Sequence, residues 1–265
     1  MTTASHGLAP SSDPTQVADV NSKRAAALII GNELLSGKIA EGNLLVLART
    51  LRGLGIVLER VVMVLDDRAR IAAEVRSLAA SHDVVFTSGG VGPTHDDQTI
   101  DAVADAFGTR AVTFPELEAM IRGYYGEAIT EGHLLMARAP EGSRLVSVPE
   151  MPWPTVIKEN VWVLPGVPQI FAMKMPVVVA ELGGGVRFVS HAVYTSLDEG
   201  PLKPLLDAVV AAHPAVEVGS YPKWREPRYR TKVTFDGQDE AAVLEARDAF
   251  VATLPLGARV DLVDE

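Results

Sequence analysis

The sequence predicts an α/β fold, in which a mostly parallel β-sheet is covered by helices on both faces, followed by a small α+β domain. In residues 25–182, short and continuously apolar runs alternate with segments of helical periodicity, which is typical of parallel strands buried on both sides. The run Gly183-Gly184-Gly185 then marks a domain boundary. In residues 186–265 the expected elements follow the order βαββαβ, that of a small ferredoxin-like unit.

The composition limits the possible functions. The net charge of −10 at pH 7 argues against binding nucleic acid over the whole surface, and no apolar run approaches the roughly 20 residues that span a membrane. The chain has no cysteine, which excludes disulfides and cysteine-based metal or nucleophile sites. Residues 1–24 are polar and lack the apolar centre of a signal peptide, so we expect a disordered leader there. We therefore expect a cytoplasmic protein with no nucleic-acid or membrane partner.

The first domain is expected to begin with three strand–helix units. Apolar, often β-branched runs predict the strands, and apolar side chains at helical spacing predict the helices. The expected strands are 24–30, 56–64 and 83–87, and the expected helices are 44–54, 68–80 and 100–107.

The remainder of this domain has a less regular pattern. Helical segments are expected over 115–139, and four larger side chains in that region are expected in a core, in an interface or as gap fillers: Tyr124, Tyr125, His133 and Met136. Strands are expected at 144–148 and 161–164, followed by a helix at 169–182 in which Met173 and Met175 are packed. Between the strands, three prolines are expected to break any regular element: Pro149, Pro152 and Pro154. Trp153 in this segment would be a lid or a subunit contact.

The second domain is expected to contain strands at 187–195 and 258–263, helices at 200–213 and 239–254, and a hairpin of 216–221 and 229–236. Basic residues of the hairpin alternate with aromatic ones: Lys223, Arg225, Arg228, Arg230 and Lys232 lie among Tyr221, Trp224 and Tyr229. Such a segment either binds a nucleotide by stacking and charge or is an ordinary solvated hairpin.

A glycine-rich stretch, residues 87–99 with the sequence TSGGVGPTHDDQT, joins an expected strand to an expected helix. Its glycines let the backbone turn tightly and bring N–H groups close to a ligand, and the helix N-terminus behind them attracts phosphate. The adjacent carboxylates Asp96 and Asp97 would then require a divalent cation between them and the phosphate. In the alternative interpretation, an aspartate here only caps the helix.

Three carboxylates follow the ends of three expected strands: Glu33, Asp66 and Asp97. Ligands of parallel sheets bind at the carboxyl ends of the strands, so we expect these side chains at one edge of the sheet. Gly166 follows a further strand, and it either brings backbone close to a ligand or closes a turn.

Three segments resemble the motifs of a known family. The sequences GNELLSG at 31–37, SGGVGPTHDDQT at 88–99 and LPGVP at 164–168 are similar to those of the molybdopterin-binding (MoaB/MogA-like) superfamily. Within it, the chain resembles the N-terminal region of CinA and the corresponding domain of eukaryotic FAD synthases. The segment MARAPEGS at 136–143 is closer to the FAD-synthase version, which favours an FAD-like dinucleotide.

The resemblance implies a three-layer α/β/α fold, a homo-oligomer, and a site for a phosphorylated pterin or a dinucleotide with Mg²⁺, Mn²⁺ or Co²⁺. It implies catalytic roles for Asp97, Asp66 and Glu33, and a metal held by Asp97 and Asp96. The substrate- and phosphate-binding residues that it implies are Gly31, Asn32, Ser88, Gly89, Gly90, Gly92, Pro93, Thr94, Thr99 and Gly166.

Two functions are consistent with these motifs. The first is metal-dependent hydrolysis of the pyrophosphate bond of a dinucleotide such as FAD or ADP-ribose. The second is the binding of molybdopterin with little hydrolysis, because the same glycine loop would serve both purposes. A regulatory scaffold with a degenerate site is disfavoured, because the glycine and aspartate positions of the loop are intact.

Overall fold

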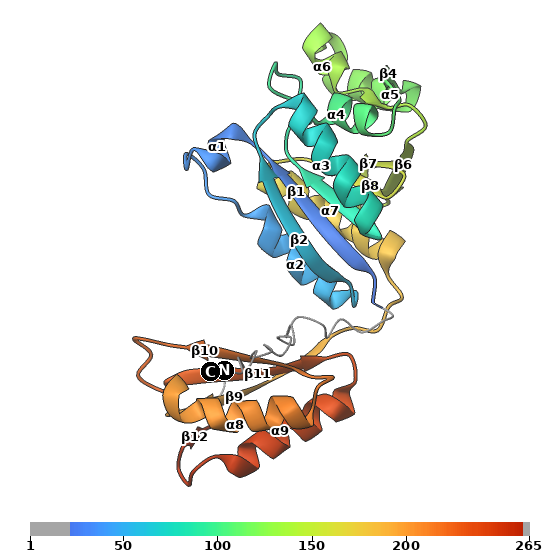
Figure 1. Ribbon diagram of the computed structural model, residues 1–265. Helices are drawn as coiled ribbons and strands as arrows, with labels where there is room; N and C mark the ends of the chain where they lie inside the picture. The colour runs from blue at the N-terminus through green and yellow to red at the C-terminus, as the bar shows by residue number, and fades with distance from the viewer. Residues whose placement is uncertain (1–21, 262–265) are drawn as a thin grey trace, which may run out of the picture. The chain divides into compact units, whose positions relative to one another are not determined.

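Figure 1 shows the computed structural model of the protein, which describes residues 22–261. These residues form two compact units, 22–187 and 188–261. The expected leader lies outside the described residues except at its end, where the expectation of disorder is wrong. Arg24 already begins the first strand, and the carbonyl of Lys23 accepts a hydrogen bond from the Val57 amide.

A six-stranded sheet forms the centre of the first unit, in the order β2-β1-β3-β8-β7-β6. Its strands are β1 (Arg24–Ile30), β2 (Val57–Val64), β3 (Val84–Ser88), β6 (Arg144–Val148), β7 (Met151–Lys158) and β8 (Val161–Leu164). The pairs β1–β2, β1–β3 and β3–β8 are parallel, whereas β7 is antiparallel to both of its neighbours. The sheet is therefore mostly parallel, as the sequence predicts.

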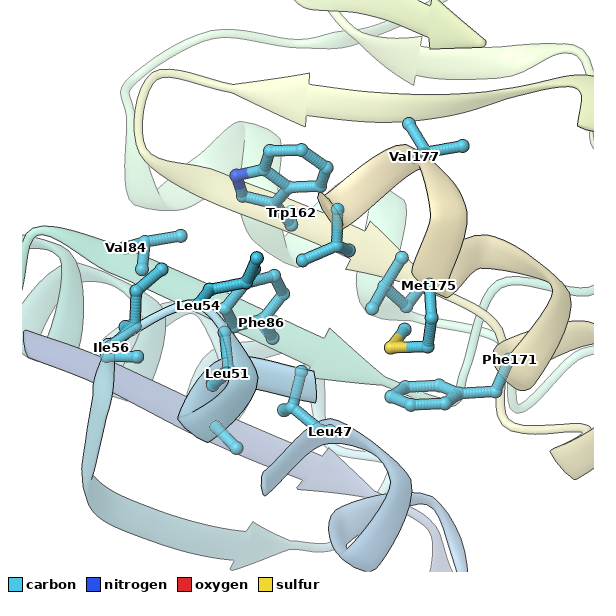
Figure 2. Close-up of a cluster of buried hydrophobic side chains, with 14 of the residues drawn as sticks. Leu47, Leu51, Leu54, Ile56, Val84, Phe86, Trp162, Phe171, Met175 and Val177 are labelled. Carbon is cyan, nitrogen blue, oxygen red and sulfur yellow. The ribbon is translucent and has the colours of Figure 1, made fainter. Parts of the chain in front are cut away.

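Helices cover both faces of this sheet. On one face lie α2 (Asn43–Gly53) and α7 (Pro168–Leu182), and on the other lie α3 (Arg68–Ser81) and α4 (Thr99–Ala106). Alternate residues of β1 enter opposite cores: Ala27 and Ile29 pack with α2 and α7, whereas Leu28 and Ile30 pack with α3 and α4. Figure 2 shows the first of these cores, in which Phe86 and Phe171 are buried. This arrangement confirms the three-layer α/β/α fold.

A smaller segment lies between β3 and β6 in the chain. It contains β4 (Ala111–Thr113), α5 (Pro115–Tyr125), the short 3₁₀ helix η1 (Gly126–Ala128), α6 (Glu131–Leu135) and β5 (Arg138–Pro140), with β4 and β5 paired antiparallel. Tyr125 and Met136 pack against its small core, and the Tyr125 ring stacks on His133 at 3.7 Å. Tyr124 is instead 76% exposed, which excludes a core position within this chain, and its place in an interface stays a prediction.

The prolines between β6 and β8 do not prevent a strand. Pro152 and Pro154 lie within β7, which contradicts the expected break. Proline cannot donate a ladder hydrogen bond and is tolerated where one side of a strand is unpaired. Here β8 pairs only with Val156–Lys158, so the proline-bearing part of β7 has a strand partner on the β6 side alone. Trp153, between the prolines, is half-buried and packs against the core.

The two methionines of α7 differ in burial. Met175 is buried as expected, but Met173 is 52% exposed, so its expected packing is wrong. The helix turns about 100° per residue, which places the two side chains on different faces. Val167, just before the helix, and Ile170 are likewise exposed at 51% and 42%.

Lys174 of α7 is buried, and no carboxylate within residues 22–261 pairs with it. Its Nζ donates hydrogen bonds to the carbonyls of Trp153 and Pro154 in β7, at 2.6 and 2.9 Å, and the residue is 4% exposed. Burial lowers the pKa of this ammonium group to about 8, because desolvation disfavours the charged form.

The lowered pKa predicts a pH dependence of stability. Between pH 8 and the ordinary lysine pKa of 10.5, the unfolded chain binds more protons at Lys174 than the folded chain does. We therefore expect the free energy of unfolding of the wild type to rise, relative to that of Lys174→Met, as the pH increases through this window. Urea unfolding of both proteins from pH 7.5 to 10 measures the difference. A constant difference would contradict the prediction.

The second unit is a four-stranded antiparallel sheet with two helices. Its elements are β9 (Val189–Thr195), α8 (Glu199–Ala212), β10 (Glu217–Pro222), β11 (Thr231–Gly237), α9 (Glu240–Thr253) and β12 (Arg259–Val260). The sheet order β10-β11-β9-β12 places the first and third strands in the centre, which is the ferredoxin-like arrangement that the sequence predicts. Within residues 22–261, no helix is long and apolar enough to cross a membrane.

Candidate functional site

Four loops leave the same edge of the parallel part of the sheet. They follow β1 at Gly31, β2 at Leu65, β3 at Gly89 and β8 at Pro165. The chain passes from β1 to β2 on one side and then to β3 on the other, so the strand order reverses at β1. Open α/β sheets bind ligands outside the carboxyl ends of the strands at such a reversal. The glycine loop after β3 lies at this point.

The glycines of this loop occupy positions that other residues cannot take without strain. Gly89 and Gly90 have φ angles of +107° and +66°, in the region that L-residues rarely adopt. A Cβ on Gly89 would overlap the carbonyl oxygen of Ile30 in the central strand, and one on Gly92 would lie 2.7 Å from the Asp97 carboxylate. The loop therefore lies directly against the end of β1, with no room for a side chain at residue 89.

Buried hydroxyl groups hold the loop in place. The Thr99 hydroxyl donates to the Gly89 carbonyl at 2.7 Å, and the Thr99 amide donates to the Gly90 carbonyl at 2.9 Å. Thr99 is completely buried and Ser88 is 3% exposed. We therefore assign these two predicted binding residues a positioning role, since their hydroxyls bond within the protein.

The turn after the glycines presents the two aspartates. The Asp97 carboxylate accepts hydrogen bonds from the amide and the hydroxyl of Thr94, at 2.8 and 2.5 Å. The Thr94 hydroxyl also lies 2.7 Å from an Asp96 oxygen, and this contact is the main cause that lowers the pKa of Asp96. An ionised carboxylate has about four lone-pair sites, and the Thr94 hydroxyl has one proton to donate. Both carboxylates therefore keep free lone pairs for a ligand. Pro93, Thr94, His95 and Asp96 of this turn are exposed, and Asp97 is half-buried.

The loops after β1 and β2 are joined by a reciprocal pair of hydrogen bonds. The Asn32 amide donates to the Asp66 carboxylate at 2.7 Å, and the Asp66 amide donates to the Asn32 side-chain oxygen at 3.3 Å. Glu33 lies in the same turn, where a Cβ on Gly31 would come 2.5 Å from its carboxylate. The pKa of Asp66 is raised, mainly by burial and further by the charges of Glu33, Asp96 and Asp97. Asp66 thus lies close enough to the other predicted carboxylates for their charges to act on it.

Two residues at the start of α2 also belong to this edge, and the sequence reasoning missed them. The buried Asn43 amide nitrogen donates to the Ser88 hydroxyl and to the Gly166 carbonyl, both at 2.9 Å, and so joins the loops after β3 and β8. The Glu41 carboxylate accepts from the amides of Asn43 and Leu44 at the helix N-terminus. An asparagine directly before the apolar run of α2 is the signal that could have revealed this role.

The donor set fits a divalent cation that is shared with a phosphate. Within residues 22–261, no three His, Cys, Asp or Glu side chains form a group that could hold a metal. Protein sites for Mg²⁺ commonly use one or two carboxylates together with substrate phosphates and water. Asp96 and Asp97 supply two neighbouring carboxylates in the turn that follows the glycines, which meets the carboxylate part of that requirement.

Comparison with known proteins gives matches over both units. Residues 26–183 match the family described as "Probable molybdopterin binding domain", and residues 187–263 match "FAD synthase, middle domain". A protein of Archaeoglobus fulgidus is 33% identical over 223 residues, which cover 83% of this chain and 93% of that one. A probable FAD synthase of Caenorhabditis briggsae is 29% identical over 256 residues, covering 86% of this chain but 49% of the relative. This chain therefore spans about half the length of that synthase.

A solved structure supports the same assignment. The crystal structure of CinA from Thermoplasma acidophilum, described as a protein of unknown function, is 30% identical and has a TM-score of 0.56. The match covers 61% of this chain and 99% of that one. The chain therefore belongs to the family of the probable molybdopterin binding domain, as the segments at 31–37, 88–99 and 164–168 indicate, and its second unit matches the middle domain of FAD synthases.

Proposed function

We propose that the protein hydrolyses the pyrophosphate bond of a dinucleotide such as FAD or ADP-ribose in a metal-dependent reaction. The observation that carries this proposal is the position of Asp96 and Asp97 in the turn that follows the glycines, at the reversal of the strand order. Backbone amides can bind phosphate oxygens there, and the carboxylates would otherwise repel the same phosphates. The naming of relatives as FAD synthases supports a nucleotide as the substrate.

The residues would divide the chemistry as follows. The amides of the glycine loop would orient the phosphates and stabilise charge that develops on them. The Thr94 hydroxyl, which donates to Asp97, would hold the two carboxylates in place. Asp97 and Asp96 would hold a divalent cation, which when bound would polarise the phosphorus and make a water more acidic. Asp66 or Glu33 would accept the proton of the attacking water, and the raised pKa of Asp66 favours it for this role.

The reaction consumes one water for each bond that it breaks. The water oxygen bonds to one phosphorus, and the bond from that phosphorus to the bridging oxygen breaks. Two phosphomonoesters leave, so FAD gives FMN and AMP, and ADP-ribose gives AMP and ribose 5-phosphate. No redox step or further co-reactant is required.

The test is an assay of AMP release from FAD and from ADP-ribose, with Mg²⁺, Mn²⁺ and Co²⁺ in turn. We expect release with at least one metal and none with a chelator. Absence of release under every condition would overturn the hydrolase proposal.

The second candidate function is the binding of molybdopterin with little hydrolysis. The match of residues 26–183 to the probable molybdopterin binding domain favours it. A fluorescent pterin that purifies with the protein, together with an absence of AMP release, would favour this function over the first.

A homo-oligomer is also proposed. Val167, Ile170 and Met173 around the start of α7 expose apolar surface that association could cover. Light scattering coupled to gel filtration would detect it, and a strictly monomeric mass at micromolar concentration would contradict it.

A further inference from the structure

The second unit has a sheet face that neither of its helices covers. Both α8 and α9 pack on the opposite face, where Val193, Val233 and Phe235 form the core with Leu202 and Phe250. Figure 1 shows the two helices on the same side of the four strands. Because side chains alternate along a strand, the residues between the buried ones in β9 and β11 lie on the other face. Within residues 188–261, no helix covers that face.

A row of aromatic and basic residues crosses this open face. Tyr221 of β10 pairs with Lys232 of β11, which in turn pairs with Tyr194 of β9. Directly paired side chains in neighbouring strands lie on the same face, so both tyrosines flank the lysine. Tyr221 is 52% exposed, and Tyr229 supports Tyr194 through an edge-on ring contact at 4.8 Å.

The next row of the same face is made of small residues. Gly219, Thr234 and Ala192 are paired across the three strands. A Cβ on Gly219 would lie 2.8 Å from the Tyr221 ring and 2.9 Å from the Thr234 hydroxyl, so the ring lies over this glycine. Thr234 is only 7% exposed, and its Oγ1 has no hydrogen-bond partner among the described residues. The Thr234 hydroxyl is therefore buried, and the ring of Tyr221 is the exposed aromatic surface of this part of the face.

Positive charge is concentrated beside the aromatic row. The loop from 223 to 230 and the start of β11 carry five basic residues and one acidic residue, Glu226, in a chain whose net charge is −10. Glu226 pairs with Arg228 at 2.9 Å, whereas Arg225, Arg230 and Lys232 form no ion pair within residues 22–261. Trp224 in this loop is 92% exposed. A cluster of unpaired cations next to exposed rings attracts a ligand that has both an anionic and an aromatic part.

We propose that this open face is a nucleotide-binding site, separate from the site on the first unit. The ring of the nucleotide stacks on Tyr221 and Tyr194, and Arg230 and Lys232 bind its phosphate. Sheet faces with exposed aromatic side chains bind bases in this manner, because every base has a flat π-face. The acidic character of the chain favours a free nucleotide over a nucleic acid, whose many phosphates it would repel.

The test uses the chain of residues 1–265 and FMN, whose ring fluorescence is quenched when it stacks on an aromatic side chain. The titrations are made with Asp97→Asn in the background and with a chelator present, so that FMN, a product of the proposed reaction, is not held through a metal at the first site. We expect saturable quenching, weakened about tenfold or more by Tyr221→Leu and by Lys232→Ala. Tyr221→Phe should retain the affinity, because the ring is kept. AMP should compete with FMN, since it also joins a flat ring to a phosphate.

The controls separate binding from folding and from general charge effects. Lys203→Ala removes a cation from α8 on the helical side of the same unit, where Lys203 pairs with Asp207, and it should leave FMN binding unchanged. Circular dichroism melts should show that the Tyr221 and Lys232 variants remain folded. Unchanged FMN affinity in Tyr221→Leu would overturn the proposal. Binding of a single-stranded RNA with much higher affinity than FMN or AMP would also overturn it, in favour of a nucleic-acid surface. These experiments measure FMN binding and not AMP release. A failure of this proposal is therefore distinguishable from a failure of the proposed hydrolysis at the first site.

Discussion

Asp97→Asn is expected to lower metal-dependent AMP release by about 100-fold or more. Replacing residues that merely support metal ligands already costs about 10–100-fold in affinity or activity, and Asp97 is placed as a ligand itself. The side-chain oxygen of asparagine can still accept hydrogen bonds from Thr94, so the turn should keep its conformation. A loss of AMP release in this variant would therefore be caused by the missing negative charge and not by a changed turn. The measurement is kcat/KM for FAD and ADP-ribose over a range of metal concentrations.

The matched control for this variant is Asp67→Asn. Asp67 caps α3 by accepting a hydrogen bond from the Arg70 amide at 2.9 Å, and asparagine caps helices about equally well. This variant makes the same change of charge in the same unit, and it should retain activity and stability. Full metal-dependent activity in Asp97→Asn would show that the carboxylate after the glycine loop does not hold the metal. Equal losses in both variants would indicate a general effect of charge instead.

Gly89→Ala is expected to disrupt both the loop and the stability of the first unit. Alanine at a φ of +107° is strained by roughly 1–3 kcal/mol, and its Cβ would also overlap the Ile30 carbonyl of the central strand. We expect a total loss of about 3 kcal/mol or more, which corresponds to roughly 6–12 °C in the Tm of a domain of this size. AMP release should be lost as well, since the amides of the loop must move away from β1.

Gly184→Ala provides a control with the same backbone geometry. Gly184 also has a φ of +107°, but a Cβ there would meet no atom within 4 Å. It should lose only the part of the stability that backbone strain accounts for, and it should keep its activity. The difference between the two variants in thermal unfolding isolates the contact between the loop and the strand. A Tm for Gly89→Ala equal to that for Gly184→Ala would contradict the close packing of the loop on β1.

Much of the fold is encoded locally, and the sequence therefore predicts it. Strands buried on both faces must be continuously apolar, and helices with one buried face must have apolar residues at helical spacing. The strand–helix alternation and the βαββαβ order can therefore be predicted from the sequence. The tight turn at residues 89 and 90 can be predicted for a similar reason. Its φ angles of +107° and +66° strain residues other than glycine, so the glycines in the sequence indicate such a turn. The resemblance of three short segments to a family also depends on sequence alone.

The exposure of Met173 and the strand formed around Pro152 and Pro154 could not be predicted in the same way. Which face of α7 is buried depends on how that helix lies on the sheet, because nearly all of its residues are apolar. Whether proline is compatible with a strand depends on whether a neighbour needs its N–H group, and that is decided by the pairing of β7 with β6 and β8.

By itself, the sequence determined most of the elements, the glycine loop and the set of carboxylates that could serve a phosphate site. Only the tertiary structure decided which of these groups meet. Asn43 joins Ser88 and Gly166, which are 45 and 123 residues away in the chain, and Asn32 pairs with Asp66 across 34 residues. The row of Tyr221, Lys232 and Tyr194 likewise exists only through the register of three strands. Strand order and register arise from packing and hydrogen bonding over the whole sheet, and no local pattern specifies them.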